Sequence, residues 1–384
     1  MRLQLTLAIL LVASTASADG TLAMRGVYYK ERSTRVMQPM LDGMFDAGAR
    51  GTVVAHFLVD AITSASPGSG AAMAKPFTEQ RYEGGIGYTQ ELDGPVAWID
   101  KLRLGGDGRI SDESDYRSIA ADIHADAALA QKNTTVGIAG GVSSDRADAS
   151  NAQSNLGGVG LLCEDDAKPG VMVGNSSSCP LTVWNAVASV SQIAGRNAVV
   201  GATYDIAYLD GFQSNPYRRV ADPASGTLIP ERHPFTRLRQ AVAGSARIYW
   251  PAAQITFIPA YRYYWDDWGM HAHTPEITLV QEVGRHADAS LMYRYYSQDA
   301  AFFWRAVYPE SPTATRPYVT ADPKMEAFDG HIIQAKLGIF GEAFDLDGRW
   351  AGARFEGIME YVVQHNQFGN AVVAHVALTL PISY

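Results

Sequence analysis

Hydrophobic and polar residues alternate along most of this chain with a period of two, the side-chain spacing of a β-strand with one apolar and one polar face. The alternation is clearest between residues 371 and 384, where His375, Thr379 and Ser383 oppose a row of mainly aliphatic side chains. Similar segments recur along the chain and predict about sixteen strands. They lie near residues 22–31, 34–46, 51–64, 77–92, 96–106, 114–129, 133–145, 181–192, 198–209, 236–250, 253–267, 273–284, 286–303, 328–343, 350–364 and 371–384.

The connections between these strands alternate between short turns and long polar segments. Asp46-Ala47-Gly48 and Leu92-Asp93-Gly94 have the residues of tight turns. In bacterial outer-membrane barrels the short turns face the periplasm and the long loops face outside. The pattern therefore predicts an all-β fold, a transmembrane antiparallel up-and-down β-barrel of about 16 strands, within a range of roughly 14 to 18. The long loops are expected near residues 65–76, 146–180, 210–235 and 304–327.

A soluble β-sandwich also alternates, so the kind of apolar residue has to separate the two folds. Here the apolar faces carry mainly Ala, Val and Gly in mid-strand, while Tyr and Trp gather toward strand ends, as in the Tyr-Arg-Tyr-Tyr segments at 261–264 and 293–296. Aromatic residues at strand ends suit the two membrane interfaces. The composition, with 47% hydrophobic residues, 36 Gly and 19 Tyr, fits either fold, and the distribution favours the membrane barrel.

Both ends of the chain carry features of export to the cell outer membrane. Met1-Arg2 precedes an apolar run from Leu3 to Ala13 and a small-residue cleavage motif that ends at Ala18, as in a signal peptide. The run is shorter than the roughly 20 residues of a membrane helix. We therefore expect a signal peptide at residues 1–18 and a single barrel domain at 19–384. The final Tyr384 resembles the C-terminal signal that the barrel-assembly machinery recognises, and outer-membrane lipid is the expected surrounding.

The net charge limits which partners are expected, and the two cysteines indicate whether a disulfide forms. The net charge is -9 and the Lys and Arg residues are scattered, which disfavours nucleic acid as a partner. The two cysteines, Cys163 and Cys179, lie in one polar segment, and in an exported protein this predicts a disulfide. The alternative is a metal site with additional ligands from Glu164, Asp165 and Asp166.

Four segments of the chain are similar to one protein family. They begin at Tyr28 (YYKERSTRV), His56 (HFLVDAITSAS), Glu113 (ESDYRS) and Asn215 (NPYRRV), and they resemble the DUF3570 family of outer-membrane β-barrel proteins of Gram-negative bacteria. The resemblance covers nearly the whole mature chain and implies this fold and this compartment. Because the family has no assigned activity, the resemblance implies no catalytic residue and no cofactor.

Charged residues on the predicted polar faces and near the loops are the candidates for the lumen and its constriction. Arginines are dense between residues 211 and 239, and if this segment enters the barrel mouth they could pair with carboxylates as an anion-selective constriction. The alternative is that these ion pairs only fasten loops to the wall. The candidates are Asp60, Asp115, Arg117, Arg218, Arg219, Arg237, Arg239, Arg262, Arg294, Arg354, Glu356 and Glu360.

Two further patterns suggest metal binding. His271 and His273 would share one strand face and could bind a transition metal, although solvated loop histidines are more common. Asp112, Glu113 and Asp115 could bind Ca²⁺, but the loop glycine and the following bidentate acid are absent. We therefore expect no metal and no cofactor.

An enzyme interpretation rests on His56 and Asp60, which share a strand face, with Ser64 as a nearby hydroxyl. No G-x-S-x-G elbow, Walker loop or dinucleotide fingerprint occurs in a fitting context. The leading hypothesis is a pore or transport barrel for small polar solutes, or a barrel that serves a periplasmic partner. A rim-active hydrolase, and a structural or adhesive barrel that binds through residues 150–178, are the alternatives.

Overall fold

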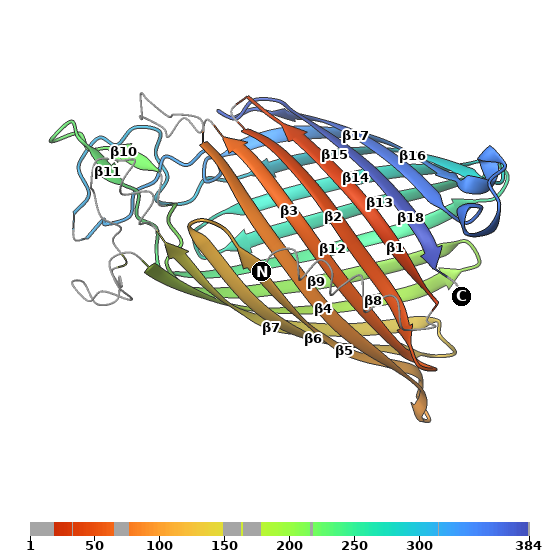
Figure 1. Ribbon diagram of the computed structural model, residues 1–384. Helices are drawn as coiled ribbons and strands as arrows, with labels where there is room; N and C mark the ends of the chain where they lie inside the picture. Colours follow the sequence, from red (N-terminus) through yellow and green to blue (C-terminus); the bar gives the residue numbers. More distant parts are fainter. Residues whose placement is uncertain are drawn as a thin grey trace.

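The chain folds into a closed antiparallel β-barrel (Figure 1). The computed structural model describes residues 19–32, 34–64, 77–148, 163, 178–215, 218–313 and 315–382, so the predicted signal peptide and Tyr384 lie outside the described residues. The barrel strands are β1 (Gly20–Lys30), β2 (Thr34–Ala47), β3 (Gly51–Ser64), β4 (Phe77–Val96), β5 (Ile99–Asp112), β6 (Tyr116–Leu129), β7 (Thr134–Asp148), β8 (Ser178–Gly195), β9 (Ala198–Gly211), β12 (Thr236–Trp250), β13 (Ile255–Asp266), β14 (His271–Val283), β15 (Ala287–Gln298), β16 (Phe328–Phe340), β17 (Arg354–Gln364) and β18 (Ala371–Ile382).

The barrel closes because β1 pairs with β18 over nearly its whole length, from Gly20 opposite Ile382 to Lys30 opposite Val372. The other barrel strands pair with their neighbours in sequence order, and β9 pairs directly with β12. Closure leaves no free strand edge, so backbone N–H and C=O groups bond within the sheet, as a hydrocarbon surrounding requires. The predicted closed barrel is confirmed. Among the described residues no helix is long and apolar enough to cross a membrane.

The two faces of the wall differ as the alternation predicts. On β6, Ile119 and Ile123 are 51% and 72% exposed on the outer face, whereas His124 points inward. Its Nε2 lies 3.1 Å from the hydroxyl of Thr89, two strands away on β4. Gly105 on β5 permits this contact, because a Cβ at this glycine would lie 2.4 Å from the imidazole nitrogen. An apolar outer face around a polar interior is the arrangement of a membrane barrel.

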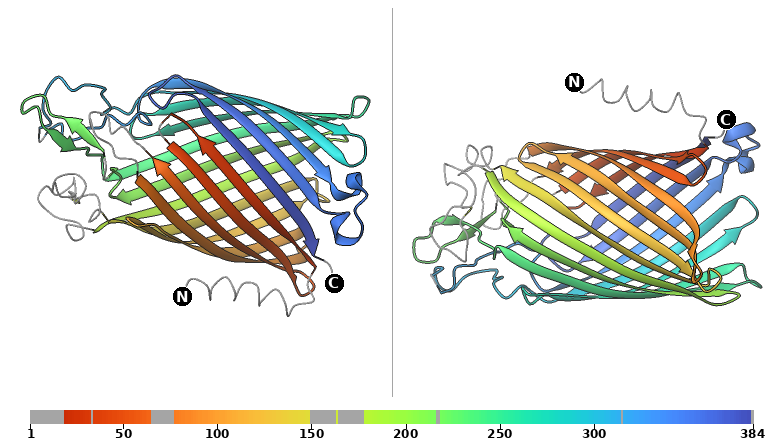
Figure 2. Two further views of the ribbon diagram at one scale, coloured as in Figure 1. Left: turned by 45° about the horizontal axis from the view of Figure 1, so that its top comes forward. Right: turned by 90° about the horizontal axis from the view of Figure 1, so that it is seen from below.

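The two ends of the barrel are built differently. At one end, here called the turn end, tight turns join strands such as β8 and β9, and β18 finishes there (Figure 1). At the other, the loop end, the described parts of the long connections 212–235 and 299–327 extend beyond the strands (Figure 2). In bacterial barrels the end with short turns faces the periplasm.

Several predicted strand bounds are wrong, and three of the errors have a clear local cause. β5 continues past residue 106 to Asp112, because it stays paired with β4 and β6. Between β16 and β17 two 3₁₀ segments, η1 (Gly341–Phe344) and η2 (Gly348–Trp350), replace the predicted tight turn. β15 ends at Gln298 rather than at residue 303, because Ala301 and Phe303 leave the sheet and are buried against Trp268.

The described residues of two connections at the loop end, 212–235 and 299–327, fold against each other, and we call them the loop platform. The first contains a hairpin that the sequence did not predict, β10 (Arg219–Ala221) paired with β11 (Leu228–Pro230). A backbone bridge joins Arg232 to Val319, and Val220 packs against Val319. The platform lies beyond the ends of the barrel strands (Figures 1 and 2).

Candidate functional site

A group of arginines lines the inner face of β12–β15. The repeated Tyr-Arg-Tyr-Tyr segments contribute to it, because the strand alternation turns the second and fourth residues of each segment inward. On β13 these are Arg262 and Tyr264, and on β15 they are Arg294 and Tyr296. β12 adds two arginines at the loop end of the same face. We call the group the arginine wall, and it consists of Arg237, Arg239, Arg262 and Arg294.

Asp266 organises the loop end of this wall. Its side chain is fully buried, and Arg237 donates to Oδ2 from Nε at 2.9 Å and from Nη2 at 2.5 Å. The Tyr264 hydroxyl donates to the same oxygen at 2.6 Å. The backbone N–H groups of Trp268 and Met270 each donate to Oδ1 at 3.0 Å. These donors occupy the acceptor sites of the carboxylate, which number about four.

Glu276 on β14 neutralises a second arginine. It lies opposite Arg294 in the β14–β15 register, and Arg294 donates to Oε2 from Nε at 2.7 Å and from Nη2 at 2.6 Å. On its other side Glu276 lies opposite Ala260, two residues from Arg262, and no ion pair joins the two described side chains. Each of the two carboxylates therefore matches one arginine of the wall.

Arg239 and Arg262 have no carboxylate partner among the described residues. Asp266 lies opposite Arg239 in the β12–β13 register, but its carboxylate forms its ion pair with Arg237 instead. The guanidinium carbons of Arg239 and Arg262 both lie 5.8 Å from the ring centre of Tyr264, at the limit of a cation–π contact. The wall thus holds a surplus of positive charge on a rigid sheet, which attracts anions through its field and through charge-assisted hydrogen bonds.

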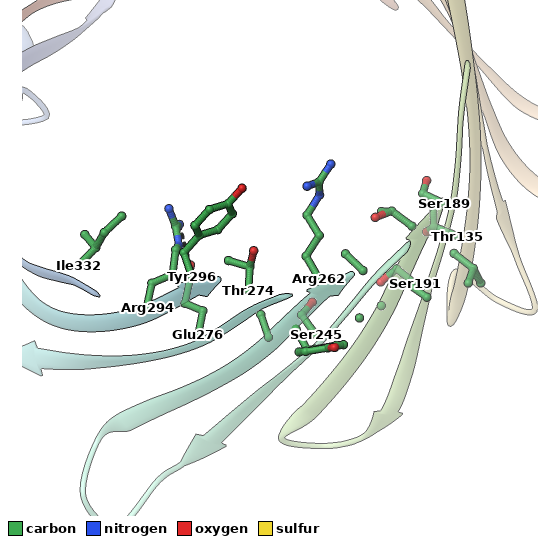
Figure 3. A pocket seen from close by; sticks show the side chains of 18 residues that line it. Thr135, Ser189, Ser191, Ser245, Arg262, Thr274, Glu276, Arg294, Tyr296 and Ile332 are labelled. Atoms are coloured by element: carbon green, nitrogen blue, oxygen red, sulfur yellow. Dashed lines mark hydrogen bonds and ion pairs between the residues drawn. The ribbon is translucent and has the colours of Figure 1, made fainter. Parts of the chain in front are cut away.

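A hollow of about 730 Å³ lies along this wall (Figure 3). In the figure Arg262 extends from β13 into the open interior, while Arg294 lies beside Tyr296. Small hydroxyl side chains, including Ser189 and Ser245, form the adjoining part of the lining. The volume is within the usual range of ligand sites, so a small solute here would contact guanidinium and hydroxyl groups together.

The wall on the far side of the lumen has the opposite charge. β4 lies eight strands from β14 in the barrel circuit, so β3–β6 face β13–β16. Ion pairs on this wall include Arg81–Asp60 at 2.6 Å, Lys101–Glu91 at 2.6 Å, Arg103–Asp126 at 3.7 Å and Arg109–Glu83 at 3.9 Å. Carboxylates still outnumber basic groups, so an electric field crosses the lumen. The inward carboxylates are Asp60, Glu79, Glu83, Glu91, Asp93, Asp107, Asp122 and Asp126, and the inward basic residues are Arg81, Lys101, Arg103 and Arg109.

The predicted lumen residues of β17 lie apart from the arginine wall and are paired. Arg354 bonds to Asp288 at 2.6 Å and to Glu356 at 3.2 Å. Glu356 also accepts from Lys336 at 2.5 Å, and Glu360 accepts from a glutamine amide of β16. These contacts cross-link the wall from β15 to β17, and this group has no surplus positive charge.

Arg218 and Arg219 lie in the loop platform rather than in the barrel wall. Arg218 forms a buried ion pair with Asp322 at 2.9 Å, which joins the two halves of the platform. Arg219 donates from Nη1 to the backbone carbonyl of Arg218 at 2.9 Å. This geometry is the one expected of arginines that fasten loops, and their part in a constriction stays a prediction.

A buried carboxylate, Glu231, supports the same platform. It accepts hydrogen bonds from the Asn215 backbone N–H at 2.7 Å and from the Thr320 hydroxyl at 2.8 Å, and it lies 3.4 Å from Nε2 of His233. Burial acts to raise the pKa of Glu231, but His233 and these donors outweigh it and hold the pKa below its ordinary value. The carboxylate is therefore a structural acceptor within the platform.

Arg117 does not line the lumen, so its assignment to the lumen is wrong. It shares the outer face of β6 with Ile119, and the inner face carries Ser118. Arg117 is the second residue of β6, which begins at Tyr116, so the strand alternation turns Arg117 outward and Ser118 inward.

The acidic cluster near this strand start differs from the predicted one. Carboxylate oxygens of Glu79, Glu113 and Asp115 lie within 4.8 Å of one another. The sequence had suggested Asp112 in place of Glu79, but Asp112 lies on the outer face of β5, opposite Arg117. Burial raises the pKa of Glu113, and the nearby Arg81 opposes this effect. Carboxylate oxygens this close together are ligands of the kind that a divalent cation takes.

His56, the candidate base of a hydrolase, faces carboxylates. Its Nδ1 lies 2.6 Å from Asp42 and its Nε2 lies 3.7 Å from Glu83. The side chain of Ser64 lies outside the described residues. Within the described part of the chain no hydroxyl group bonds to His56, so the nucleophile of a rim hydrolase has no observed counterpart.

The histidines of β14 lie on the strand rather than in a loop, and they face outward. His271 is the first residue of β14, and Nδ1 of His273 lies 2.6 Å from the hydroxyl of Tyr261. A second contact of this kind joins His331 to Tyr293 at 2.8 Å. Both belong to an outer aromatic belt near the loop end, as at a membrane interface.

Cys163 and Cys179 form a disulfide with a Cα–Cα distance of 5.5 Å. Cys179 lies opposite Ala147 on β7, and both cysteines are buried together with Phe212. The bond therefore fixes residue 163 to the inner side of the wall at the loop end.

Comparisons with known proteins agree with this architecture. A structure titled "Bacterial polysaccharide outer membrane secretin" matches with a TM-score of 0.50 and 8% identity over 94% of this chain and 98% of the other. The outer membrane protein OprD from Pseudomonas aeruginosa gives 0.44 and 8% over 96% and 94%, and a BenF-like porin from Pseudomonas fluorescens Pf-5 gives 0.43 and 9% over 96% and 99%. Identities this low describe the fold alone.

No protein with a curated description matches this chain. The family model described as "Protein of unknown function (DUF3570)" matches residues 7–340, which is most of the chain. The chain therefore belongs to the DUF3570 family, and its fold is that of an outer-membrane β-barrel.

Proposed function

We propose that this barrel is a diffusion pore for small polar solutes and that the arginine wall favours solutes with carboxylate or phosphate groups. The observation that carries the proposal is the pair Arg239 and Arg262, two unmatched guanidinium groups exposed on the inner face of a closed barrel. Barrels of 16 to 18 strands are wide enough for an aqueous channel. An anion at this wall would accept the bidentate hydrogen bonds that guanidinium groups make well.

The strength of the contact suits passage rather than retention. Both guanidinium groups are exposed to the lumen, so water screens them, and a contact between unit charges at 4 Å is then worth about 1 kcal/mol. Conduction requires binding that favours entry and still permits release. The acidic wall opposite the arginines would add orientation, because a solute with charges of both signs would align with the field.

Conductance and reversal potential in planar lipid bilayers test the proposal. The variant Arg239→Gln/Arg262→Gln removes the two unmatched charges of the arginine wall. The control Arg196→Gln/Arg285→Gln removes the same charge from exposed residues of the turn end, outside the strands. We expect open-channel conductance in all three proteins, and an anion-to-cation permeability ratio that falls about fivefold in the wall variant alone, equivalent to about 1 kcal/mol.

The two parts of the proposal fail separately. A folded, reconstituted barrel without conductance would exclude the pore. Conductance with an unchanged permeability ratio in the wall variant would retain the pore and exclude anion preference by these arginines.

A further inference from the structure

Two pairs of basic side chains face outward at the loop end of the barrel. On β6 and β7, Arg117 lies directly opposite Arg146. On β1 and β2, Lys30 lies directly opposite Arg35. All four side chains are exposed, and we call the two pairs the rim clamps.

Each clamp lies where the apolar outer surface ends. One step toward the turn end on the same outer face, Tyr28 lies opposite Met37 and both are exposed. The corresponding residue beside the other clamp is Ile119, which is also exposed. In a membrane barrel the apolar band covers the hydrocarbon, and the residues just beyond it meet the lipid headgroups. The clamps are therefore at headgroup level.

Among the described residues, no carboxylate forms an ion pair with a clamp residue. Many other basic residues of the barrel form ion pairs, such as Arg25 with Asp42 at 3.4 Å. Asp112 lies opposite Arg117 on β5, but no ion pair joins these two described side chains. Like charges directly opposite on neighbouring strands destabilise a sheet. Two such pairs at the same end indicate that the compensating anion comes from outside the protein.

We propose that the rim clamps bind phosphate groups of the glycolipid in the outer leaflet of the membrane. Opposite residues of neighbouring strands have Cβ atoms about 4.5–5.5 Å apart, so both side chains of a clamp can reach one phosphate. Arg and Lys are the residues suited to such a contact. The position favours a lipid over a free anion, because the acyl chains of a bound lipid would lie along the apolar band directly below each clamp. The β13–β16 side differs, since its outer face carries the Tyr–His contacts at this end.

The test uses the folded full-length barrel in detergent micelles, with diphosphorylated lipid A as the probe. Native mass spectrometry counts bound lipids, and a titration gives the affinity. The variants are Arg117→Gln/Arg146→Gln and Lys30→Gln/Arg35→Gln, and the control is the turn-end pair Arg196→Gln/Arg285→Gln. A basic residue near an anionic membrane surface contributes about 1 kcal/mol, or about fivefold in affinity. We therefore expect each clamp variant to bind lipid A up to about 25-fold more weakly at its site, and the control to bind as the wild type does.

Three results would overturn the proposal. These are equal lipid A binding by the wild type and both clamp variants, an equal loss in the turn-end control, and full displacement of lipid A by inorganic phosphate at a similar concentration. Heat-modifiable migration on gels verifies that each variant is folded. Where a double variant does not fold, the single variants Arg117→Gln and Lys30→Gln serve, because each relieves a like-charge contact and is expected to lose about fivefold.

Discussion

Replacement of Arg237 by Met is expected to lower the free energy of unfolding by about 3–5 kcal/mol, because it leaves a buried carboxylate without its counter-charge. The side chain of Asp266 has no exposed surface, so water cannot replace the two hydrogen bonds that Arg237 donates. The variant also loses the contact of the guanidinium with the Trp268 ring, at 4.1 Å. The Tyr264 hydroxyl and two backbone N–H groups still bond to Asp266, which keeps the loss within this range.

The second half of the experiment separates the charge from the hydrogen bonds. In Asp266→Asn the amide oxygen can still accept from the backbone N–H groups, and we expect a loss of about 1–3 kcal/mol. The double variant Arg237→Met/Asp266→Asn contains no buried charge. It should therefore lose less than the sum of the single variants, by about 1–3 kcal/mol. Arg239→Met is the matched control, since Arg239 neighbours the same carboxylate without bonding to it, and it should cost less than about 1 kcal/mol.

Reversible urea unfolding in lipid vesicles, followed by tryptophan fluorescence, measures these differences. Losses in the double variant that equal the sum of the single variants would refute a coupled buried pair. Equal losses for Arg237→Met and Arg239→Met would refute the assignment of the counter-charge to Arg237.

The remaining predictions concern the loop end. Replacing Cys163 and Cys179 by Ser removes a disulfide with a sequence separation of 16. The free energy of unfolding should fall by about 3 kcal/mol relative to the oxidised wild type. A loss below about 1 kcal/mol would contradict a stabilising role of the disulfide. The lowered pKa of Glu231 predicts a platform whose stability is complete above the ordinary glutamate value of 4.5 and declines as the pH falls through and below it. Tryptophan-fluorescence melting between about pH 7 and 3 should show this decline in the wild type and much less of it in Glu231→Gln, and identical pH profiles would exclude Glu231 as the cause.

The fold could be predicted from the sequence because every strand of a membrane barrel has an apolar face toward lipid and a polar face toward the lumen, and this gives an alternating pattern of residues. Ile119, Asp122 and Ile123 show this on β6, since each points to the side that the alternation assigns. The prediction failed where apolar residues serve another purpose. Ala301 and Phe303 resemble the end of a strand in sequence, but they pack in the loop platform, and a pattern of period two does not distinguish the two uses.

The candidate site could be predicted only in part. The alternation turns Arg262 and Arg294 inward, and the repeated Tyr-Arg-Tyr-Tyr segments draw attention to both. The sequence did not reveal that Arg237 forms an ion pair with Asp266 and that Arg294 forms one with Glu276. Such pairings depend on the register between strands, which a single sequence does not contain. The surplus arginines are what remains after pairing, so they could be recognised only in the structure.

The unmatched arginines of the wall, Arg239 and Arg262, lie on strands, and there is a physical reason for their place. An arginine in a long connection can move with its backbone until it meets a carboxylate, as Arg218 meets Asp322 in the loop platform. A strand residue is held by the ladder of backbone hydrogen bonds on both sides, and Arg262 cannot leave its position opposite Thr274 to reach Glu276, which Arg294 occupies. The sheet therefore preserves charges that a flexible segment would neutralise. Such charges remain available to a ligand, whether it arrives from the lumen or from the lipid.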